Sequence, residues 1–257
     1  MSLQKLFRVI LGVAVLIGVV SLTAAVAGYS KRDALGAVVA GCALNKKLSG
    51  SAFPCLAIEQ GLAPSAYALI RPPRNPTEIL IVPTADIAGI EAPELSTLAA
   101  AHYWQAAWEA RDSVAAAAGR PLDRNAVALA VNSKATRTQD RFHIHVDCLG
   151  AAEQAAFAEH GRGITTQWSR FPVQLGKHNF WVRALAGDDL VTANPVSLIL
   201  QGLPFAARDP GAMSLAVVGA TLADGSNGFY LVAEQALPRK WGSGQTEDLL
   251  DHRCGQP

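Results

Sequence analysis

The sequence predicts an α+β fold, an antiparallel sheet with flanking helices, preceded by one transmembrane helix at the N-terminus. Three observations support this. The chain begins with a charge-free apolar run, helical and strand patterns then alternate, and a turn between two apolar runs predicts a β-hairpin near the C-terminus. We divide the chain into a membrane anchor, residues 1–32, and one exported domain, residues 33–257, which is long enough to bury a large core.

The anchor is predicted from Val9 to Gly28, a run of 20 residues without a charged side chain. At about 1.5 Å per residue, a helix of this length matches the hydrocarbon core of a bilayer. Lys5 and Arg8 precede the run, so we expect the N-terminus inside and the domain exported. Because the run is longer than the apolar region of ordinary signal peptides, we favour a retained signal anchor, with a cleaved signal as the alternative.

Four cysteines in an exported domain indicate two disulfides, which can be drawn in more than one way. Cys42 and Cys55 enclose a short, loop-like stretch, so we favour a Cys42–Cys55 bond, and Cys148–Cys254 follows by elimination. The net charge of +1, with evenly mixed signs, gives no reason to expect a nucleic-acid partner. We find no internal repeat in the sequence and make no prediction of oligomeric state.

Periodicity and turn residues predict the elements of the exported domain. Trp104 and Trp108 fall on the apolar stripe of the longest helical segment, so we expect them in the core. The segment after His160 reads as a looser region that extends to the last hairpin. In chain order we predict a helix at 33–46, strands at 66–70 and 78–82, one or two helices over 94–119, strands at 126–132 and 142–149, a helix at 151–160, and hairpin strands at 214–222 and 229–233.

The strand at 142–149 carries the most informative motif. Side chains alternate between the two faces of a strand, so His143, His145 and Asp147 share one face and apolar residues take the other. Burying an unpaired polar group costs about 1–3 kcal/mol, so three such groups on one strand need partners or a function. Taken alone, this face could be solvated, bind a metal or provide a nucleophile.

The stretch from Ala128 to His145 resembles the histidine-triad superfamily of nucleotide hydrolases and transferases. In that superfamily a strand ending in Asn, a small polar loop and a Gln precede a strand with histidines at alternate positions. Within it, the chain is similar to the bacterial CDP-diacylglycerol pyrophosphatase family over essentially its whole length. The residues that carry this resemblance are Trp104–Asp112, Asn132, Ser133, Arg137–Gln139, Phe142–His145, Cys148, Gly176–His178 and Asp251–Cys254.

The resemblance implies a HIT-like fold and a hydrolase of phospholipid metabolism that acts on a phosphoric anhydride. Its substrate would be CDP-diacylglycerol in the membrane, cleaved to CMP and phosphatidate through a nucleotidyl-histidine, with no cofactor. A neutral imidazole is a good nucleophile near pH 7, which suits this chemistry. With the anchor at residues 9–28, the resemblance also predicts a single-pass protein of the bacterial inner membrane with its catalytic domain in the periplasm.

Two registers assign the nucleophile differently. The superfamily's spacing from Gln139 makes His145 the central residue of a triad formed with His143 and Asp147, and we favour this register. The other takes Arg141, His143 and His145 as the triad, with His143 attacking. Asp147 departs from the family's usual His or Gln, and a carboxylate there would repel phosphate unless it orients His145 or is protonated.

Six other side chains are candidates for binding the substrate and its phosphates. Four lie in or next to the loop that faces the histidine strand, one precedes the strand on its histidine face, and one lies in a distant Gly-Lys-His motif, where it could also protonate the leaving group. These candidates are Asn132, Lys134, Arg137, Gln139, Arg141 and His178. We expect His102 and His160 to be surface or packed residues, and His252 to be structural.

Two other enzymatic functions compete with this one. The His143-x-His145-x-Asp147 pattern also resembles the metal-binding motif of metallo-β-lactamase-type hydrolases, although Cys148 stands where those enzymes have a further histidine. A cytidylyltransferase would share the histidine mechanism and pass the nucleotide to an acceptor other than water. A non-enzymatic hypothesis is that the histidine face binds a lipid or a partner without catalysis.

Overall fold

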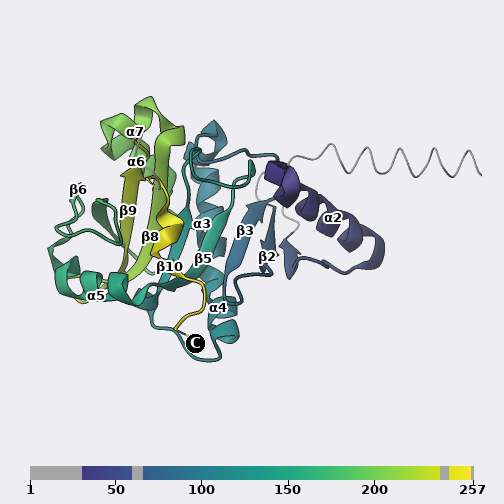
Figure 1. Cartoon of the computed structure of the whole chain (residues 1–257), viewed down its shortest axis with the longest axis horizontal. Coiled ribbons are helices and arrows are strands. Elements are labelled where there is room, and N and C mark those ends of the chain that lie inside the picture. The colour runs from purple at the N-terminus through teal and green to yellow at the C-terminus, as the bar shows by residue number, and fades with distance from the viewer. Residues whose placement is uncertain (1–30, 60–65, 238–242, 256–257) are drawn as a thin grey trace, which may run out of the picture.

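The computed structural model describes residues 31–59, 66–237 and 243–255. They form a twisted antiparallel sheet with helices on both faces, so the predicted α+β class is confirmed (Figure 1). The predicted anchor at residues 9–28 lies outside this part of the chain. Within the described ranges no helix has the length and apolar character needed to cross a membrane.

The sheet contains ten strands among the described residues, in the order β1-β2-β3-β5-β4-β8-β9-β7-β6, with β10 paired to β5. Every pair is antiparallel. The strands are β1 Ala57–Glu59, β2 Tyr67–Ile70, β3 Ile79–Pro83, β4 Val127–Val131, β5 Ile144–Leu149, β6 Ser169–Arg170, β7 Trp181–Ala186, β8 Met213–Thr221, β9 Asn227–Gln235 and β10 Leu250–Asp251.

Helices cover both faces of this sheet. One face packs against α3, α4 and α6, where Trp104 and Trp108 are buried as predicted. The other face packs against α2 at the β1–β3 end and against α5 farther along. The helices are α2 Ala34–Ser49, α3 Ala101–Glu109, α4 Arg111–Ala118, α5 Ala151–His160, α6 Pro195–Gly202 and α7 Pro204–Arg208, with short 3-10 turns η1 Lys31–Asp33, η2 Pro93–Ser96, η3 Leu98–Ala100, η4 Arg124–Ala126, η5 Gly161–Gly163, η6 Pro210–Ala212 and η7 Thr246–Leu249.

The strand order is symmetric about the central β4–β8 pair, which the sequence did not suggest. In chain order the first half runs β2, β3, α3–α4, β4, β5, and the second runs β6, β7, α6–α7, β8, β9. In space each half repeats the same order outward from the centre. The structure therefore has a topological repeat although the sequence shows none, because the two halves share their connections and not their residues.

The looser region predicted after His160 is the main error in the predicted elements. It contains the six-residue strand β7 and the helices α6 and α7. Pro195 begins one helix and Pro204 the next, so neither is long enough to produce a clear helical period. The other predicted elements are found within a few residues of their expected bounds, α3 being preceded by 3-10 turns.

The last described segment, residues 243–255, lies on the same face as α5 and joins the two halves; we call it the C-terminal strap. The hydroxyl of Thr246 is buried and donates to the carbonyl oxygens of Val131 in β4 and Leu215 in β8, at 3.0 and 3.1 Å. Leu249 and Leu250 are buried against the sheet. The strap ends at Cys254, which is bonded to Cys148 in β5, and the other predicted disulfide, Cys42–Cys55, is also present.

Candidate active site

Strand β5 presents His143, His145 and Asp147 to one face of the sheet. Ile144 and Val146 are fully buried in the core on the opposite face, so the alternation expected from the sequence is observed. All three polar side chains are buried, and His143 and His145 lie edge to face with ring centroids 4.7 Å apart. Burial of this kind is costly without partners, and the structure supplies a different partner for each of the three.

His143 has the geometry of a neutral nucleophile. Its Nδ1 lies 2.6 Å from the carbonyl oxygen of Arg141. Because a carbonyl oxygen only accepts hydrogen bonds, Nδ1 must carry the hydrogen. Burial, and next to it the charge of His145, lower the pKa of His143 to about 3, so the ring is neutral near pH 7. A neutral ring with its hydrogen on Nδ1 leaves the lone pair of Nε2 free to attack.

His145 is instead held between two carboxylates. Its Nδ1 lies 2.5 Å from Glu78 Oε1, and its Nε2 lies 3.5 Å from Glu247 Oε2. Burial alone would lower the pKa of His145, but Glu247 and Glu78 outweigh it and the pKa is raised. We therefore expect an imidazolium, which is a poor nucleophile but stabilises negative charge.

Two asparagines fix the carboxylates that hold His145. Asn75 donates to Glu78 Oε2 at 2.5 Å. Asn132, at the end of β4, donates to Glu247 Oε2 at 2.7 Å and accepts from the Glu247 backbone N–H at 3.2 Å. Asn132 thus contacts Glu247 of the strap, and Glu247 in turn lies beside His145.

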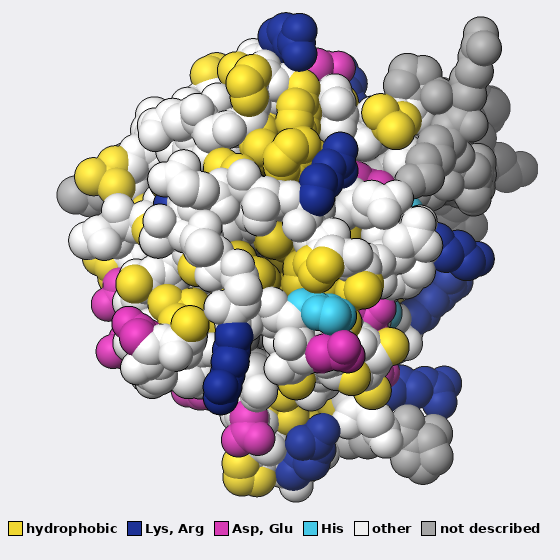
Figure 2. Space-filling view, turned by 90° about the vertical axis from the view of Figure 1, so that its left-hand side faces the viewer, with side chains coloured by type: hydrophobic (Ala, Val, Ile, Leu, Met, Phe, Trp, Pro, Cys, Tyr) yellow, Lys and Arg dark blue, Asp and Glu magenta, His cyan; other side chains and the backbone are white. Residues whose placement is uncertain are grey.

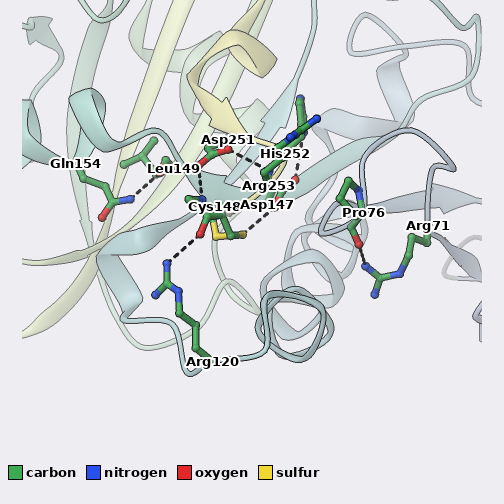
Figure 3. Close-up of a disulfide and its surroundings, with 12 residues drawn as sticks. Arg71, Pro76, Arg120, Asp147, Cys148, Leu149, Gln154, Asp251, His252 and Arg253 are labelled. Atoms are coloured by element: carbon green, nitrogen blue, oxygen red, sulfur yellow. Dashed lines mark hydrogen bonds and ion pairs between the residues drawn. A yellow bond between two sulfur atoms is a disulfide. The ribbon is translucent and has the colours of Figure 1, made fainter. Parts of the chain in front are cut away.

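The side chain of Asp147 contacts the strap, and Figure 3 shows it next to His252. Its Oδ2 lies 3.1 Å from Nδ1 of His252, and its Oδ1 accepts from the Cys148 backbone N–H at 2.8 Å. The hydrogen bond to Asp147 raises the pKa of His252 despite partial burial of the ring. The partner of Asp147 is therefore His252, which the sequence predicts to be structural. Burial raises the pKa of Asp147, although the hydrogen bonds with His252 and the Cys148 backbone N–H favour its charged form.

A cavity of about 420 Å³ opens beside the histidines. Its polar lining includes His143, His145, Glu78 and Glu247. Its apolar lining comes from the start of α2 and from strands β2 and β3, with Leu35, Val38, Ile70 and Leu80, and Leu80 is the strand partner of His145. A cavity lined by both kinds of side chain suits a ligand that carries both a phosphate group and a flat or apolar group.

The predicted phosphate-binding residues are mostly engaged elsewhere. Arg137 is buried and forms a bidentate pair with Glu91 at 2.8 and 2.7 Å. Arg141 pairs with Asp86, Lys134 is exposed, and none of these three cations lines the cavity. Gln139 does line it, and its Oε1 accepts from the Leu35 backbone N–H at 2.9 Å, which fastens α2 to the loop.

His178 lies in the other half of the sheet and does not join the β5 histidines. Its Nδ1 lies 3.0 Å from Glu234 Oε2, and its Nε2 lies 3.7 Å from Asp248 Oδ2. His178 and Glu234 are both buried. The structure therefore gives His178 carboxylate partners and no place on the wall of the cavity.

Sequence reasoning missed Glu78 and Glu247, and it named His252 but expected it to be structural. Glu78 had a local signal, because it shares the alternating face of Leu80 at the start of an otherwise apolar strand. Glu247 and His252 had none, since they reach the site only through the fold of the strap. The predicted Cys148–Cys254 bond was nevertheless a clue, because it ties the residues just before Cys254 to β5.

The metal-binding alternative depends on His143, His145 and Asp147 converging on one point. Among the described residues, the ligand atoms close enough to share an ion belong to two groups, Asp147 with the disulfide cysteines, and Glu78 with Glu247 and His252. Neither group is the predicted trio. The three side chains turn to different partners, so the geometry does not favour the His-x-His-x-Asp site.

Comparison with known proteins links this site to a family. Residues 30–257 match the family model described as CDP-diacylglycerol pyrophosphatase. A protein from Yersinia pestis named CDP-diacylglycerol pyrophosphatase is 31% identical to this chain over 227 residues, which are 88% of this chain and 85% of the relative. The matched range contains β5, the cavity and the strap.

Proposed function

The chain belongs to the CDP-diacylglycerol pyrophosphatase family, and we propose that it hydrolyses CDP-diacylglycerol to CMP and phosphatidate through a nucleotidyl-histidine on His143. One observation carries the choice of nucleophile. The Nδ1–H of His143 is fixed on a backbone carbonyl, whereas both ring nitrogens of His145 face carboxylates. These contacts favour the register in which Arg141, His143 and His145 form the triad and His143 attacks. In that register, Arg141 stands where the superfamily has its first histidine.

In the first step, Nε2 of His143 attacks the phosphorus of the cytidylyl group. An N–P bond forms, the bridging P–O bond breaks, and phosphatidate leaves with the bonding electrons. A phosphate leaving group needs little protonation to depart. In the second step, water attacks the same phosphorus, the N–P bond breaks, and its electron pair returns to Nε2, so His143 is neutral again. One proton of the water stays on the phosphate of CMP and the other is released to solvent. Atoms and charges balance with water as the only co-substrate.

His145 is the charge-stabilising residue of this mechanism. Its imidazolium lies beside the attacking ring and offsets the charge that develops on the phosphoryl oxygens. Glu78 and Glu247 keep it protonated and oriented, and His252 balances the nearby Asp147. Without these cations, the three carboxylates would repel a diphosphate strongly at such short range.

The topology and the disulfides support two further parts of the proposal. The arrangement of β3, the helices, β4 and β5, with the histidines on β5, fits a HIT-like unit, and the second half of the sheet repeats its connections. Two disulfides fit an oxidising compartment such as the periplasm. We assign residues 9–28 as the inner-membrane anchor on their composition.

The test is to trap the intermediate with CDP-diacylglycerol labelled at the cytidylyl phosphorus. We expect rapid quenching to yield labelled protein, and His143→Ala to abolish the label and lower kcat/KM by about 10³-fold or more. His145→Ala should slow labelling without abolishing it. Lys134→Ala, which alters an exposed cation away from the cavity, is the matched control and should behave as wild type.

Two outcomes would contradict the proposal. Labelling that persists in His143→Ala but disappears in His145→Ala would restore the first register. Loss of hydrolysis in chelator, regained with a divalent metal, would favour the metal alternative. Adding alcohols or phosphate as acceptors and measuring the products would separate a hydrolase from a cytidylyltransferase.

A further inference from the structure

Exposed apolar side chains gather at the C-terminal end of α2 and in the loop that follows it. Eight large hydrophobic side chains are exposed in the described part of the chain, and four of them fall between residues 44 and 56. Leu44 and Leu48 are 58% and 75% exposed, and Phe53 and Leu56 are 73% and 51% exposed. We call these four side chains the apolar tip. Exposed apolar clusters of this kind mark interaction sites.

The apolar tip is built rigidly. The Cys42–Cys55 disulfide joins α2 to the returning loop, and Asn45 donates to the Phe53 carbonyl oxygen at 2.9 Å. Leu44 and Leu48 lie one helical turn apart, so they share a face of α2. The four side chains are therefore exposed on a segment that a covalent bond and a hydrogen bond hold in place.

The charged side chains within the segment that carries the apolar tip are lysines, and the acids Asp33 and Glu59 flank this segment. Lys46 and Lys47 lie in the last turn of α2, and residues 34–58 contain no Asp or Glu. The opposite end of the molecule differs, since Figure 2 shows acidic and basic side chains interspersed there with apolar ones. Apolar side chains next to lysines fit the surface of an anionic bilayer, where the apolar groups enter the interface and the lysines meet lipid phosphates.

The position of α2 agrees with this partner. Figure 1 shows α2 projecting from the end of the sheet that carries β2 and β3. Its first turn provides Leu35 and Val38 to the cavity wall, and the charge-free run at residues 9–28 ends shortly before that turn. At about 1.5 Å per residue, Leu48 lies roughly 20 Å along the helix from Leu35. Contacts at both ends of α2 would lay the helix along the bilayer and hold the cavity at the membrane surface.

We propose that the apolar tip is a second membrane contact, which inserts into the interface of an anionic bilayer and orients the cavity toward lipid substrates. The contact is distinct from the anchor, because it lies on the folded domain. This proposal rests on the proposed function in one respect, which is that the substrate is a lipid that must be taken from the bilayer. The choice between His143 and His145 does not affect it.

A direct test measures insertion of the apolar tip. The full chain is reconstituted into vesicles of phosphatidylethanolamine and phosphatidylglycerol, with a polarity-sensitive fluorophore on Leu48→Cys. The matched control carries it on Leu98→Cys, also an exposed leucine at 69% but in η3, next to the helices of the other face. We expect lipids spin-labelled on the acyl chain to quench the Leu48 probe at least about threefold more than the Leu98 probe. Equal quenching would overturn the proposal.

A second test measures what the contact does for catalysis. In Leu48→Glu/Phe53→Glu, we expect hydrolysis of long-chain CDP-diacylglycerol in vesicles to fall about tenfold, since two charges would oppose insertion. Hydrolysis of a water-soluble, short-chain CDP-diacylglycerol by the same variant should stay unchanged. The control Leu98→Glu should hydrolyse both the long-chain and the short-chain substrate like the wild type. An equal loss on both substrates would refute the membrane role.

The remaining outcomes separate this proposal from the proposed function. If wild type hydrolyses neither substrate, the function fails while the quenching test still decides insertion. If the Leu48 probe is shielded only as protein concentration rises, and lipid quenchers do not reach it, the apolar tip binds a second copy of the chain and the membrane proposal is wrong.

Discussion

Each half of the sheet buries one histidine against one glutamate, yet only one of these pairs faces the cavity. In the first half, His145 lies 2.5 Å from Glu78, and in the second, His178 lies 3.0 Å from Glu234. All four residues are buried. The two pairs are therefore alike in burial and in the kind of partner, and they differ in that only His145 and Glu78 line the cavity beside β5.

The C-terminal strap places one acidic side chain beside the buried histidine of each half. Its consecutive residues Glu247 and Asp248 lie 3.5 and 3.7 Å from the Nε2 atoms of His145 and His178. One short segment thus adds a second acid to each pair and fastens the two halves together. The strap alone therefore does not distinguish the two halves.

The neighbours of the two histidines make the difference. His143 stands edge to face with His145, whereas Phe180 lies beside His178 with ring centroids 5.9 Å apart. On the same face as the β5 histidines, β9 presents Tyr230 and Val232, which pack in the core. The buried pair is therefore common to both halves, and Glu234 also lines a cavity of its own, of about 350 Å³, with Arg170 and Trp181. The second histidine ring, that of His143, distinguishes the first half.

The largest effect should come from releasing the strap. Cys148 and Cys254 are 106 residues apart, and bonds that close loops of about this length stabilise by up to ~4.7 kcal/mol in the chain-entropy model. We expect Cys148→Ser/Cys254→Ser to lose much of this free energy of unfolding in denaturant titration. It should also lose activity, because Glu247 and His252 are then held less firmly.

The control for the strap is the other disulfide. Cys42 and Cys55 are 13 residues apart, for which the same model gives about 3 kcal/mol. Cys42→Ser/Cys55→Ser should therefore lose less stability and keep its activity on a water-soluble substrate. Equal loss of that activity in both variants would mean that the strap has no special role in the site.

Neutralising the glutamate of each buried pair compares the halves directly. We expect Glu78→Gln to lower kcat/KM about 100-fold, because His145 loses the carboxylate that keeps it charged and oriented. Glu234→Gln should change kcat/KM by less than about threefold, although either variant can lose about 1–3 kcal/mol of stability at a buried hydrogen bond. Steady-state kinetics and denaturant titration separate these effects. An equally inactive Glu234→Gln would place His178 in the active site, as the sequence predicted.

The sequence was most informative where chemistry and structure share one short segment. Alternation along β5 fixed the common face of three polar residues, and the disulfides followed from loop length and count. The roles of the histidines could not be read in the same way. They depend on which atoms face the rings, and Glu78, Glu247 and the Arg141 carbonyl reach them only through pairing across the sheet and the path of the strap.

The second half was harder to predict than the first for a related reason. Its helices α6 and α7 have eight and five residues, and such short helices give little periodic signal. Asn194 begins α6 by accepting from the backbone N–H groups of Val196 and Ser197, a capping signal that the Asn-Pro dipeptide would have supported. The two halves repeat the same order of strands and helices, but this repeat cannot be detected in the sequence because the residues that form it differ between the halves.

The smallest predicted effect, on the pH profile, tests the strap's acids. Glu247 helps to raise the pKa of His145, so activity that requires the imidazolium should fall as pH rises through that raised value. In Glu247→Gln the charged form loses a partner and the pKa of His145 falls, so the alkaline limb of kcat should move to lower pH by about one unit. Asp248→Asn, which alters the acid beside His178, should leave the limb in place. An alkaline limb that stays fixed in Glu247→Gln would show that His145 is not the titrating group and that the two halves use their acids in the same, purely structural way.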